Sequence, residues 1–276
     1  MSTALAVYHG RFGRATLYKL NKPLSTHAHR EGHLVFKVGG RDSEMVVSER
    51  AHALSARFGS AVNPWQPHSF LPGDPDNGSV FLTLYIKPSW FLEVGRNAQG
   101  ALRFGRNAIE VTGQIERLIH IVSNFLLEDE HRDLFDGYLY ELTSCCYDQS
   151  WQWSGAEHDL RASFSGIRDF RIRNSIRLMR ERIGDEPALD RIASDSGLSR
   201  PHFFKLFRQN IGVTPNIYMN TLRMECSIDR LATTSDAITT IGLDLGFSSQ
   251  ASFTRFFTAN VGIPPTDYRR ATYLSH

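Results

Sequence analysis

Four histidines in the N-terminal half have the chemistry and the spacing of a binding site. His27, His29 and His33 stand within one short segment, and His68 ends a second one. Imidazole nitrogens bind Zn²⁺, Fe²⁺ and Ni²⁺, so the four side chains are possible metal ligands. Alternate residues of a strand face the same side, so these histidines could equally line a ligand pocket without a metal. We expect the pocket, and neither a metal ion nor another cofactor.

Several arginines of the same half could bind an anion. Arg11 with Arg14 and Arg103 with Arg106 form two pairs at a spacing of three residues, and Arg57 stands between the pairs. A guanidinium holds a carboxylate or a phosphate through two parallel hydrogen bonds. With the rings nearby, this chemistry suits a sugar, an aromatic acid or an anionic nucleotide, whereas scattered surface arginines are the alternative. The expected effector-binding residues are His27, His29, His33, Trp65, His68, Arg11 and Arg14.

The C-terminal third contains an internal repeat. Residues 189–199 match residues 238–248, with Ile192 opposite Ile241 and Gly197 opposite Gly246, at a separation of about 50 residues. The match continues in the same order through Phe203 and Phe253, Phe207 and Phe257, Asn210 and Asn260, Gly212 and Gly262, and Pro215 and Pro265. So many matched positions in order indicate a duplicated structural unit.

Each copy has the pattern of a helix-turn-helix. A short helix with a buried isoleucine is followed by a small residue, Ala193 or Gly242, which allows close helix packing. Gly197 or Gly246 then ends the first helix in a conformation with positive φ, and a serine starts the second helix. Residues 215–231 read as one uninterrupted helix between the units. It would hold the two second helices in adjacent major-groove segments, about one turn or roughly 34 Å apart.

Residues 166–270 resemble the DNA-binding domain of the AraC/XylS family of bacterial transcriptional regulators. The resemblance implies an all-α domain with two helix-turn-helix units joined by a linker helix. The matching residues are Ile192, Ala193, Gly197, Leu198, Ser199, Phe207, Gly212, Pro215, Tyr218, Arg223, Ile241, Gly246, Phe247, Ser248, Phe253, Phe256, Phe257, Gly262, Pro264, Pro265, Tyr268 and Arg269.

On this pattern the recognition helices span residues 200–209 and 249–258. Lys205 would donate to guanine, Phe204 would pack on a thymine methyl, and Gln250 and Arg255 would suit adenine and guanine. Pro201 and Phe204 depart from the polar or indole residues usual there, so we expect sequence reading mainly from the second unit. The expected DNA-binding residues are Arg200, Pro201, Phe204, Lys205, Arg208, Gln250, Ala251, Ser252, Thr254 and Arg255.

The first hundred residues predict a β domain. Segments 14–20, 33–38, 44–47 and 80–86 read as strands separated by glycine and proline turns, which is typical of a sandwich or barrel. The two histidine segments resemble the motifs of the cupin β-barrel, which implies a cupin-like barrel; there His33 stands where the metal-binding acid is usual. Apolar residues at helical spacing predict two helices within residues 112–148, which either cover the sheet or pair with another copy.

Composition fits an ordinary folded chain with a basic C-terminal part. The 276 residues are 41% hydrophobic and 22% charged with a net charge of +2, which argues against disorder and against a polycation. Residues 1–165 carry 16 basic and 18 acidic side chains, whereas residues 166–276 carry 15 and 11. We find no signal peptide or membrane span, and three cysteines do not make a disulfide framework. These features predict a cytoplasmic protein without a membrane partner.

These observations predict a multidomain architecture. Residues 1–148 would form an effector-binding and dimerisation domain, with the barrel at about 1–105 and the helices at about 112–148. Residues 149–165 would be a linker, and residues 166–276 the DNA-binding domain, with its units at about 189–210 and 238–260.

The predicted function is that of a transcriptional regulator, not an enzyme. It would bind double-stranded DNA, respond to a small-molecule effector, act as an activator that contacts RNA polymerase, and form a homodimer. The alternatives are a cupin-type metal enzyme with a DNA-binding appendage and a constitutive regulator whose barrel only dimerises.

Overall fold

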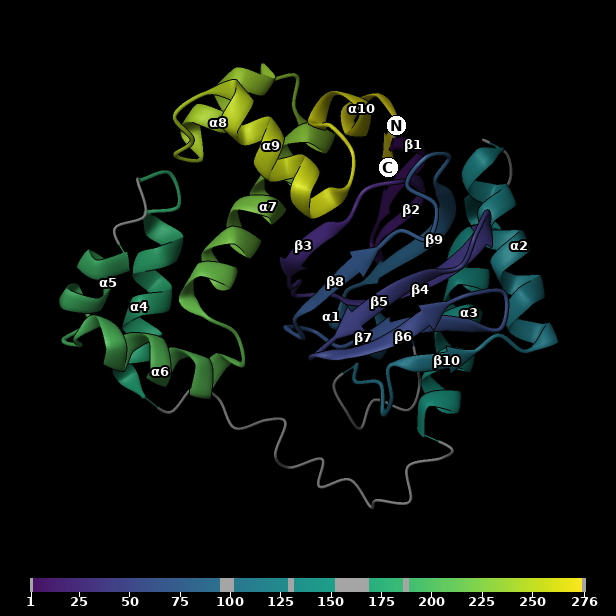
Figure 1. Cartoon of the computed structure of the whole chain (residues 1–276), viewed down its shortest axis with the longest axis horizontal. Coiled ribbons are helices and arrows are strands. Elements are labelled where there is room, and N and C mark those ends of the chain that lie inside the picture. The colour runs from purple at the N-terminus through teal and green to yellow at the C-terminus, as the bar shows by residue number, and fades with distance from the viewer. Residues whose placement is uncertain (1, 95–101, 129–131, 152–168, 186–188, 275–276) are drawn as a thin grey trace.

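A β-rich N-terminal part and a helical C-terminal part lie side by side (Figure 1). The computed structural model describes residues 2–94, 102–128, 132–151, 169–185 and 189–274. Residues 149–151 of the predicted linker belong to the last helix of the N-terminal part, and its other residues, 152–165, lie outside the described ranges.

The strands form two sheets. Seven strands pair in the order β10-β7-β4-β9-β2-β1-β11 and four in the order β3-β8-β5-β6. The larger sheet contains β1 (Thr3–Gly10), β2 (Gly13–Leu20), β4 (Gly32–Gly39), β7 (Phe58–Val62), β9 (Ser79–Ile86), β10 (Ala108–Glu110) and β11 (Thr272–Leu274). The smaller sheet contains β3 (Leu24–His27), β5 (Ser43–Val47), β6 (Arg50–Leu54) and β8 (His68–Leu71).

The antiparallel β domain agrees with the prediction, but the described strands do not close a barrel. The smaller sheet pairs only within itself, and no ladder joins its edges to the larger sheet. Instead, Val35 and Phe81 of the larger sheet share a core with Met45 and Phe70 of the smaller one. The cupin-like closure is therefore not confirmed.

Two helices cover the other face of the larger sheet (Figure 1). In α2 (Gly113–Leu127), Ile115, Leu118 and Val122 are buried at helical spacing, and they share a core with Leu17 and Leu34 of the sheet. α3 (Arg132–Trp151) packs against α2 and adds Leu139 and Leu142 to this core. Of the two roles considered for the pair, the structure shows the covering of the sheet. A short helix, α1 (Pro88–Val94), follows β9.

The C-terminal helices contain the repeat found in the sequence. They are α4 (Phe170–Glu181), α5 (Leu189–Asp195), α6 (Arg200–Ile211), α7 (Pro215–Thr233), α8 (Ile238–Asp244), α9 (Gln250–Val261) and α10 (Pro265–Arg270). Gly197 and Gly246 have φ values of 71° and 80° in the turns that follow α5 and α8, as predicted. A Cβ atom on Gly242 would lie 2.8 Å from that of Phe253, so α8 and α9 approach too closely for a larger residue.

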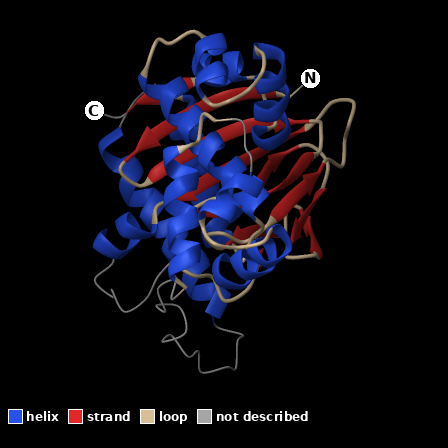
Figure 2. Ribbon diagram, turned by 90° about the vertical axis from the view of Figure 1, so that its left-hand side faces the viewer, coloured by secondary structure: helices blue, strands red, loops and turns tan. Residues whose placement is uncertain are grey.

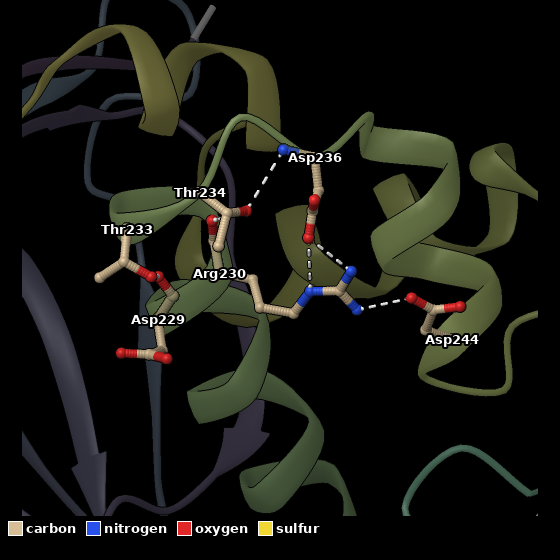
Figure 3. A network of polar contacts seen from close by, with 6 residues as sticks. All are labelled: Asp229, Arg230, Thr233, Thr234, Asp236 and Asp244. Atoms are coloured by element: carbon tan, nitrogen blue, oxygen red, sulfur yellow. Dashed lines mark hydrogen bonds and ion pairs between the residues drawn. The ribbon is translucent and has the colours of Figure 1, made fainter.

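Arg230 of the linker helix α7 forms hydrogen bonds and ion pairs with the second helix-turn-helix unit and with the loop before it (Figure 3). Its guanidinium donates to Asp236 Oδ2 at 2.6 and 3.1 Å, and to Asp244 Oδ2 of α8 at 2.9 Å. Thr234, which ends α7, accepts from the Asp236 backbone N–H at 3.3 Å. Arg230 therefore fixes the angle at which α8 leaves the linker helix.

Replacing Arg230 by methionine should lower the free energy of unfolding by about 1 kcal/mol, because one half-buried guanidinium loses charge-assisted hydrogen bonds to two carboxylates that are 40% and 54% exposed. The Arg230 side chain is 21% exposed. Arg177→Met is the matched control, since the Arg177 pair with Glu181 lies within one helix and is 58% exposed. Urea unfolding measures both variants; equal losses would show that Arg230 has no special role.

Three of the C-terminal helices, α7, α9 and α10, contact strands of the β domain. In Figure 2 helices lie in front of the strands on this side of the molecule. Strand β11 pairs in parallel with β1, opposite Val7 to His9. One buried cluster contains Phe81 of the sheet together with Ile228 of α7 and Phe257 of α9. The sequence did not reveal this shared core, because the apolar residues of both parts are explained locally by their own helices and strands.

Candidate DNA interface and effector pocket

Helix α6, the predicted first recognition helix, presents a basic face. Arg200, Pro201, Lys205 and Arg208 are exposed, whereas Phe204 is half-buried. Arg200 is engaged within its own unit, since its guanidinium lies 3.1 Å from Asp190 Oδ1 and 5.5 Å from the Phe204 ring centre. Lys205 and Arg208 are therefore the more available cations of α6.

The second recognition helix, α9, is exposed mainly in its N-terminal half. Gln250, Ala251 and Arg255 are exposed, whereas Ser252 and Thr254 are half-buried. The Ser252 hydroxyl accepts from the Ser249 backbone N–H at 3.1 Å and closes a capping box. Its hydroxyl is thus used in starting the helix, and Gln250 accepts a hydrogen bond from Thr239.

The other end of α9 is buried against the β domain. Val261 is 8% exposed, and a Cβ atom on Gly262 would lie 2.7 Å from a methyl group of Leu20. Helix-turn-helix proteins read bases with the N-terminal residues of the recognition helix. The contact with the β domain therefore leaves the reading end of α9 free.

The structure brings together all four predicted histidines. His27 ends β3, His68 begins β8 opposite it, and His33 lies in β4. The ring centres of His27 and His68 are 4.3 Å apart, those of His33 and His68 4.4 Å, and those of His27 and His29 4.8 Å. All four rings are buried. We call this group the histidine cluster.

Backbone carbonyls set the tautomer of two of these rings. Nδ1–H of His27 donates to Ser25 O at 2.6 Å, and Nδ1–H of His68 donates to Gln66 O at 2.8 Å. His29 Nε2, His33 Nδ1 and His68 Nε2 are buried without a hydrogen-bond partner among the described residues. Buried polar atoms normally have partners, so these nitrogens are available to hydrogen-bond a small molecule that enters the cluster.

Burial also keeps the histidine cluster uncharged. It lowers the pKa of His27 to about 4 and that of His33 to about 3, and the positive charge of Arg14 adds to both shifts. The pKa values of His29 and His68 fall well below the ordinary value for the same main reason, with a further contribution from the neighbouring rings. Neutral imidazoles can accept as well as donate hydrogen bonds.

The cluster offers the donor atoms of a metal site. One ligand nitrogen each from His27, His29 and His68 can be chosen so that all lie within 4.8 Å of one another. Tetrahedral Zn²⁺ with bonds of about 2.1 Å needs ligand atoms about 3.4 Å apart. The arrangement is therefore compatible with metal binding as well as with the predicted lining of a ligand pocket.

Three members of the predicted effector site do not join the cluster. The Trp65 ring stacks on Tyr218 of α7 at 4.8 Å, in the contact between the two parts of the chain. Arg11 is exposed and lies 3.8 Å from Glu93, whereas Arg14 is buried with its guanidinium 3.7 Å above the Tyr85 ring. Arg11 and Arg14 therefore do not form a clamp: the turn residues between them send the two side chains to opposite environments.

Two hollows adjoin the histidine cluster. The first is a small cavity of about 30 Å³ lined by His27, His33, His68, Tyr18, Phe70 and Val261. It has room for a water molecule or two, so a larger ligand would have to open it. The second is a cleft of about 380 Å³ between the β domain and α7, which includes Arg14, His29 and Glu225. This cleft was not predicted, because its two walls are far apart in sequence.

The segment that carries the histidines also contacts the linker helix. Ala28 O accepts from the Thr221 hydroxyl at 2.9 Å, and Arg30 forms an ion pair with Glu225. Alternate residues of this segment therefore face the cluster and α7. A change in the pocket would be transmitted directly to the helix that joins the two helix-turn-helix units.

None of the helices in the described ranges has the length and apolar character needed to cross a membrane.

A family model described as a helix-turn-helix domain matches residues 192–271. The probable transcriptional regulator LumQ of Photobacterium leiognathi is 22% identical over 250 residues, which is 91% of this chain and 94% of LumQ. The regulator MtrA of Neisseria gonorrhoeae is 24% identical over 112 residues, 41% of this chain but only 37% of MtrA.

The fold is also that of a solved regulator. The apo form of a ToxT variant from Vibrio cholerae superimposes with a TM-score of 0.56 at 16% identity, over 93% of this chain and 96% of that protein. Wild-type ToxT with an unsaturated fatty acid bound gives a TM-score of 0.55 at 16% identity, over 92% of this chain and 94% of ToxT. The likeness thus covers both the β domain and the helical domain.

Proposed function

We propose that this chain is an effector-responsive transcriptional regulator of the AraC type that reads DNA with both of its helix-turn-helix units; the helix-turn-helix match over residues 192–271 supports this. The observation that carries the proposal is the pair of recognition helices, α6 and α9, whose reading ends are exposed while the rest of each unit is packed. Helix α7 joins the units as one uninterrupted helix and sets the distance between them.

The proposed DNA-binding set is the predicted one, with different weights for its members. Lys205 and Arg255 are exposed on the two helices and suit guanine, and Arg208 suits a phosphate. Arg200 would have to exchange Asp190 for the DNA backbone, and Ser252 would contribute mainly as a cap. The remaining proposed contacts come from Pro201, Phe204, Gln250, Ala251 and Thr254.

Hydroxyl-radical footprinting of the full chain on duplexes selected from a random library tests this function. We expect two protected segments about 10 base pairs apart on one face of the duplex, one for each unit. The double variant Lys205→Ala with Arg255→Ala should lose both, whereas Arg50→Ala, which removes an exposed charge of the β domain, should retain them. If no DNA sequence is enriched from the library, or if only one segment is protected, the proposal that both units bind DNA is overturned.

We assign residues 1–148 to the effector-binding domain, 149–165 to the linker and 166–276 to the DNA-binding domain. ToxT, which has been solved with a fatty acid bound, shares the fold over both parts, and this supports a small-molecule ligand for the β domain. The effector would act by favouring one arrangement of the β domain and α7, since binding shifts an equilibrium only through such a difference.

Activation, and with it a contact to RNA polymerase, is part of the same proposal. So is a homodimer, for which Leu127 and Leu134, 58% and 57% exposed at adjoining ends of α2 and α3, are apolar side chains that a second copy would cover. Reporter transcription with and without the operator tests activation. Sedimentation of the purified chain tests the homodimer.

The alternative of a metal enzyme is tested by metal analysis. We expect purified protein to contain far less than one transition-metal ion per chain, because His33 stands where the metal-binding acid of a cupin is usual. Dialysis against Zn²⁺ followed by desalting should leave the metal content unchanged. If the protein instead retains one metal ion per chain, and if His68→Gln abolishes this retention while a change of the exposed His120 does not, the metal site would be favoured.

A further inference from the structure

A buried arginine without an acidic partner lies in the cleft between the β domain and the linker helix. Arg14 of β2 is 8% exposed, and among the described residues no carboxylate oxygen comes within 4.0 Å of its guanidinium. Its Nε has no hydrogen-bond partner in that part of the chain. The group is always charged, and leaving such a charge buried and unpaired is costly.

The neighbours of Arg14 compensate for this charge only in part. The Tyr85 ring lies 3.7 Å below the guanidinium, which gives a cation–π contact. His9 faces the same region and is uncharged, because burial lowers its pKa to about 3, as does the charge of Arg14. Lys87 adds a second positive charge to the wall of the cleft. Glu31 lines the same cleft, and the Tyr268 hydroxyl is a hydrogen-bonding neighbour of Arg14, so both offset part of this positive charge. Arg14, the buried cation of this wall, is the group on which an anion would bind.

The opposite wall offers hydrogen-bond acceptors. Glu225 of α7 pairs with Arg30 through Oε2, whereas its other oxygen, Oε1, is buried without a partner among the described residues. His29 Nε2 lines the same cleft and is also without a partner there. A ligand that satisfies these atoms carries hydrogen-bond donors, such as hydroxyl groups, in addition to its negative charge.

We propose that this cleft binds a hydroxylated carboxylate of the sugar-acid class, with its carboxylate on Arg14 and its hydroxyls on Glu225 and His29. The cleft volume of about 380 Å³ suits a ligand of that size. Because one wall is β2 and the other α7, the ligand would bind both parts of the chain at once. This site would give the proposed effector response its ligand class. Binding of the ligand can be tested by itself, and only its effect on DNA binding rests on the proposed function.

Thermal unfolding of the full chain with three probes tests this assignment. Sodium D-gluconate at about 10 mM should raise the Tm by roughly 3 °C or more. Sorbitol, which has the hydroxyls without the carboxylate, and hexanoate, which has the carboxylate without the hydroxyls, should each raise the Tm by less than a third of that shift. No shift with gluconate, or an equal shift with hexanoate, would overturn the proposal.

Two variants separate binding from folding. Arg14→Met should abolish the gluconate shift while leaving the Tm of the free protein equal or higher, because it removes an unpaired buried charge. Lys87→Met, at the exposed rim, should weaken gluconate binding at least fivefold in calorimetric titration, and Lys22→Met, outside the cleft, should not. If Arg14→Met does not fold, the Lys87 comparison decides alone. Operator binding without any ligand is measured in parallel, so failure of the sugar-acid site is distinguished from failure of the DNA-binding function.

Discussion

Acidification from pH 7.5 to pH 5 is expected to destabilise this protein by about 4 kcal/mol through two histidines alone. In the unfolded chain a histidine takes up its proton near pH 6.5, whereas burial lowers the pKa of His27 to about 4 and that of His33 to about 3. Between these values the unfolded state binds more protons than the folded state. Stability is therefore fully present above pH 6.5 and falls as the pH drops towards 4, by about 2 kcal/mol for each ring at pH 5.

Urea unfolding at a series of pH values measures this loss. His33→Gln replaces the ring by an amide that does not titrate, so the variant should lose about 2 kcal/mol less than the wild type between pH 7.5 and pH 5. His120→Gln, in the exposed face of α2, is the matched control and should follow the wild-type curve. Because the four rings interact, the curve reports the cluster as a unit. Parallel curves for all three proteins would contradict the uncharged cluster.

The helical domain could be predicted well because the information is local and repeated. The positions of Gly197 and Gly246 follow from where each short helix must stop, and the structure gives both a positive φ. Gly242 was expected to permit a close helix approach, and it lies against Phe253. Such features depend on neighbours within one helix-turn-helix unit, so two copies of the pattern reinforce each other.

The pocket could be predicted only in part, since it depends on which strands become neighbours. The spacing of the histidines indicated a common site, and pairing of β3 with β8 brings His27 opposite His68. Trp65 was placed in the same site by its position near His68, yet its ring lies on Tyr218. Nothing in the local sequence of Trp65 indicates a partner more than 150 residues away, because packing between domains has no periodicity to detect.

Contacts between the domains give the predicted effector response a physical route. The segment from His27 to Arg30 lines the histidine cluster with two residues and contacts α7 with the other two. Trp65 is held to the same segment, since its backbone N–H donates to His29 O at 2.7 Å. These contacts support the proposal that a ligand at this segment acts on DNA binding through α7, the helix that joins the two helix-turn-helix units.

Replacing Arg255 by alanine should reduce affinity for the selected operator about 5- to 150-fold, which corresponds to about 1 to 3 kcal/mol for one guanine contact. Arg255 is exposed in the reading half of α9, where a side chain can reach a base edge. The same variant should lose discrimination at one base pair of the site. Arg208→Ala should instead weaken all sequences alike and reduce the salt slope by about one charge, since a phosphate contact carries no sequence information.

Phe204→Ala completes the comparison by testing the first unit. Phe204 is half-buried against Phe203 and beside the Arg200 guanidinium, so it can present one edge of its ring to a thymine methyl. We expect a smaller loss than for Arg255, confined to substitutions of that thymine. Binding titrations on single-base variants of the operator, with Arg50→Ala as the control for lost charge, resolve the three patterns. Discrimination that survives Phe204→Ala unchanged, together with a uniform loss for Arg255→Ala, would mean that neither helix reads bases through these side chains. Specificity would then have to come from the shape and the bending of the duplex.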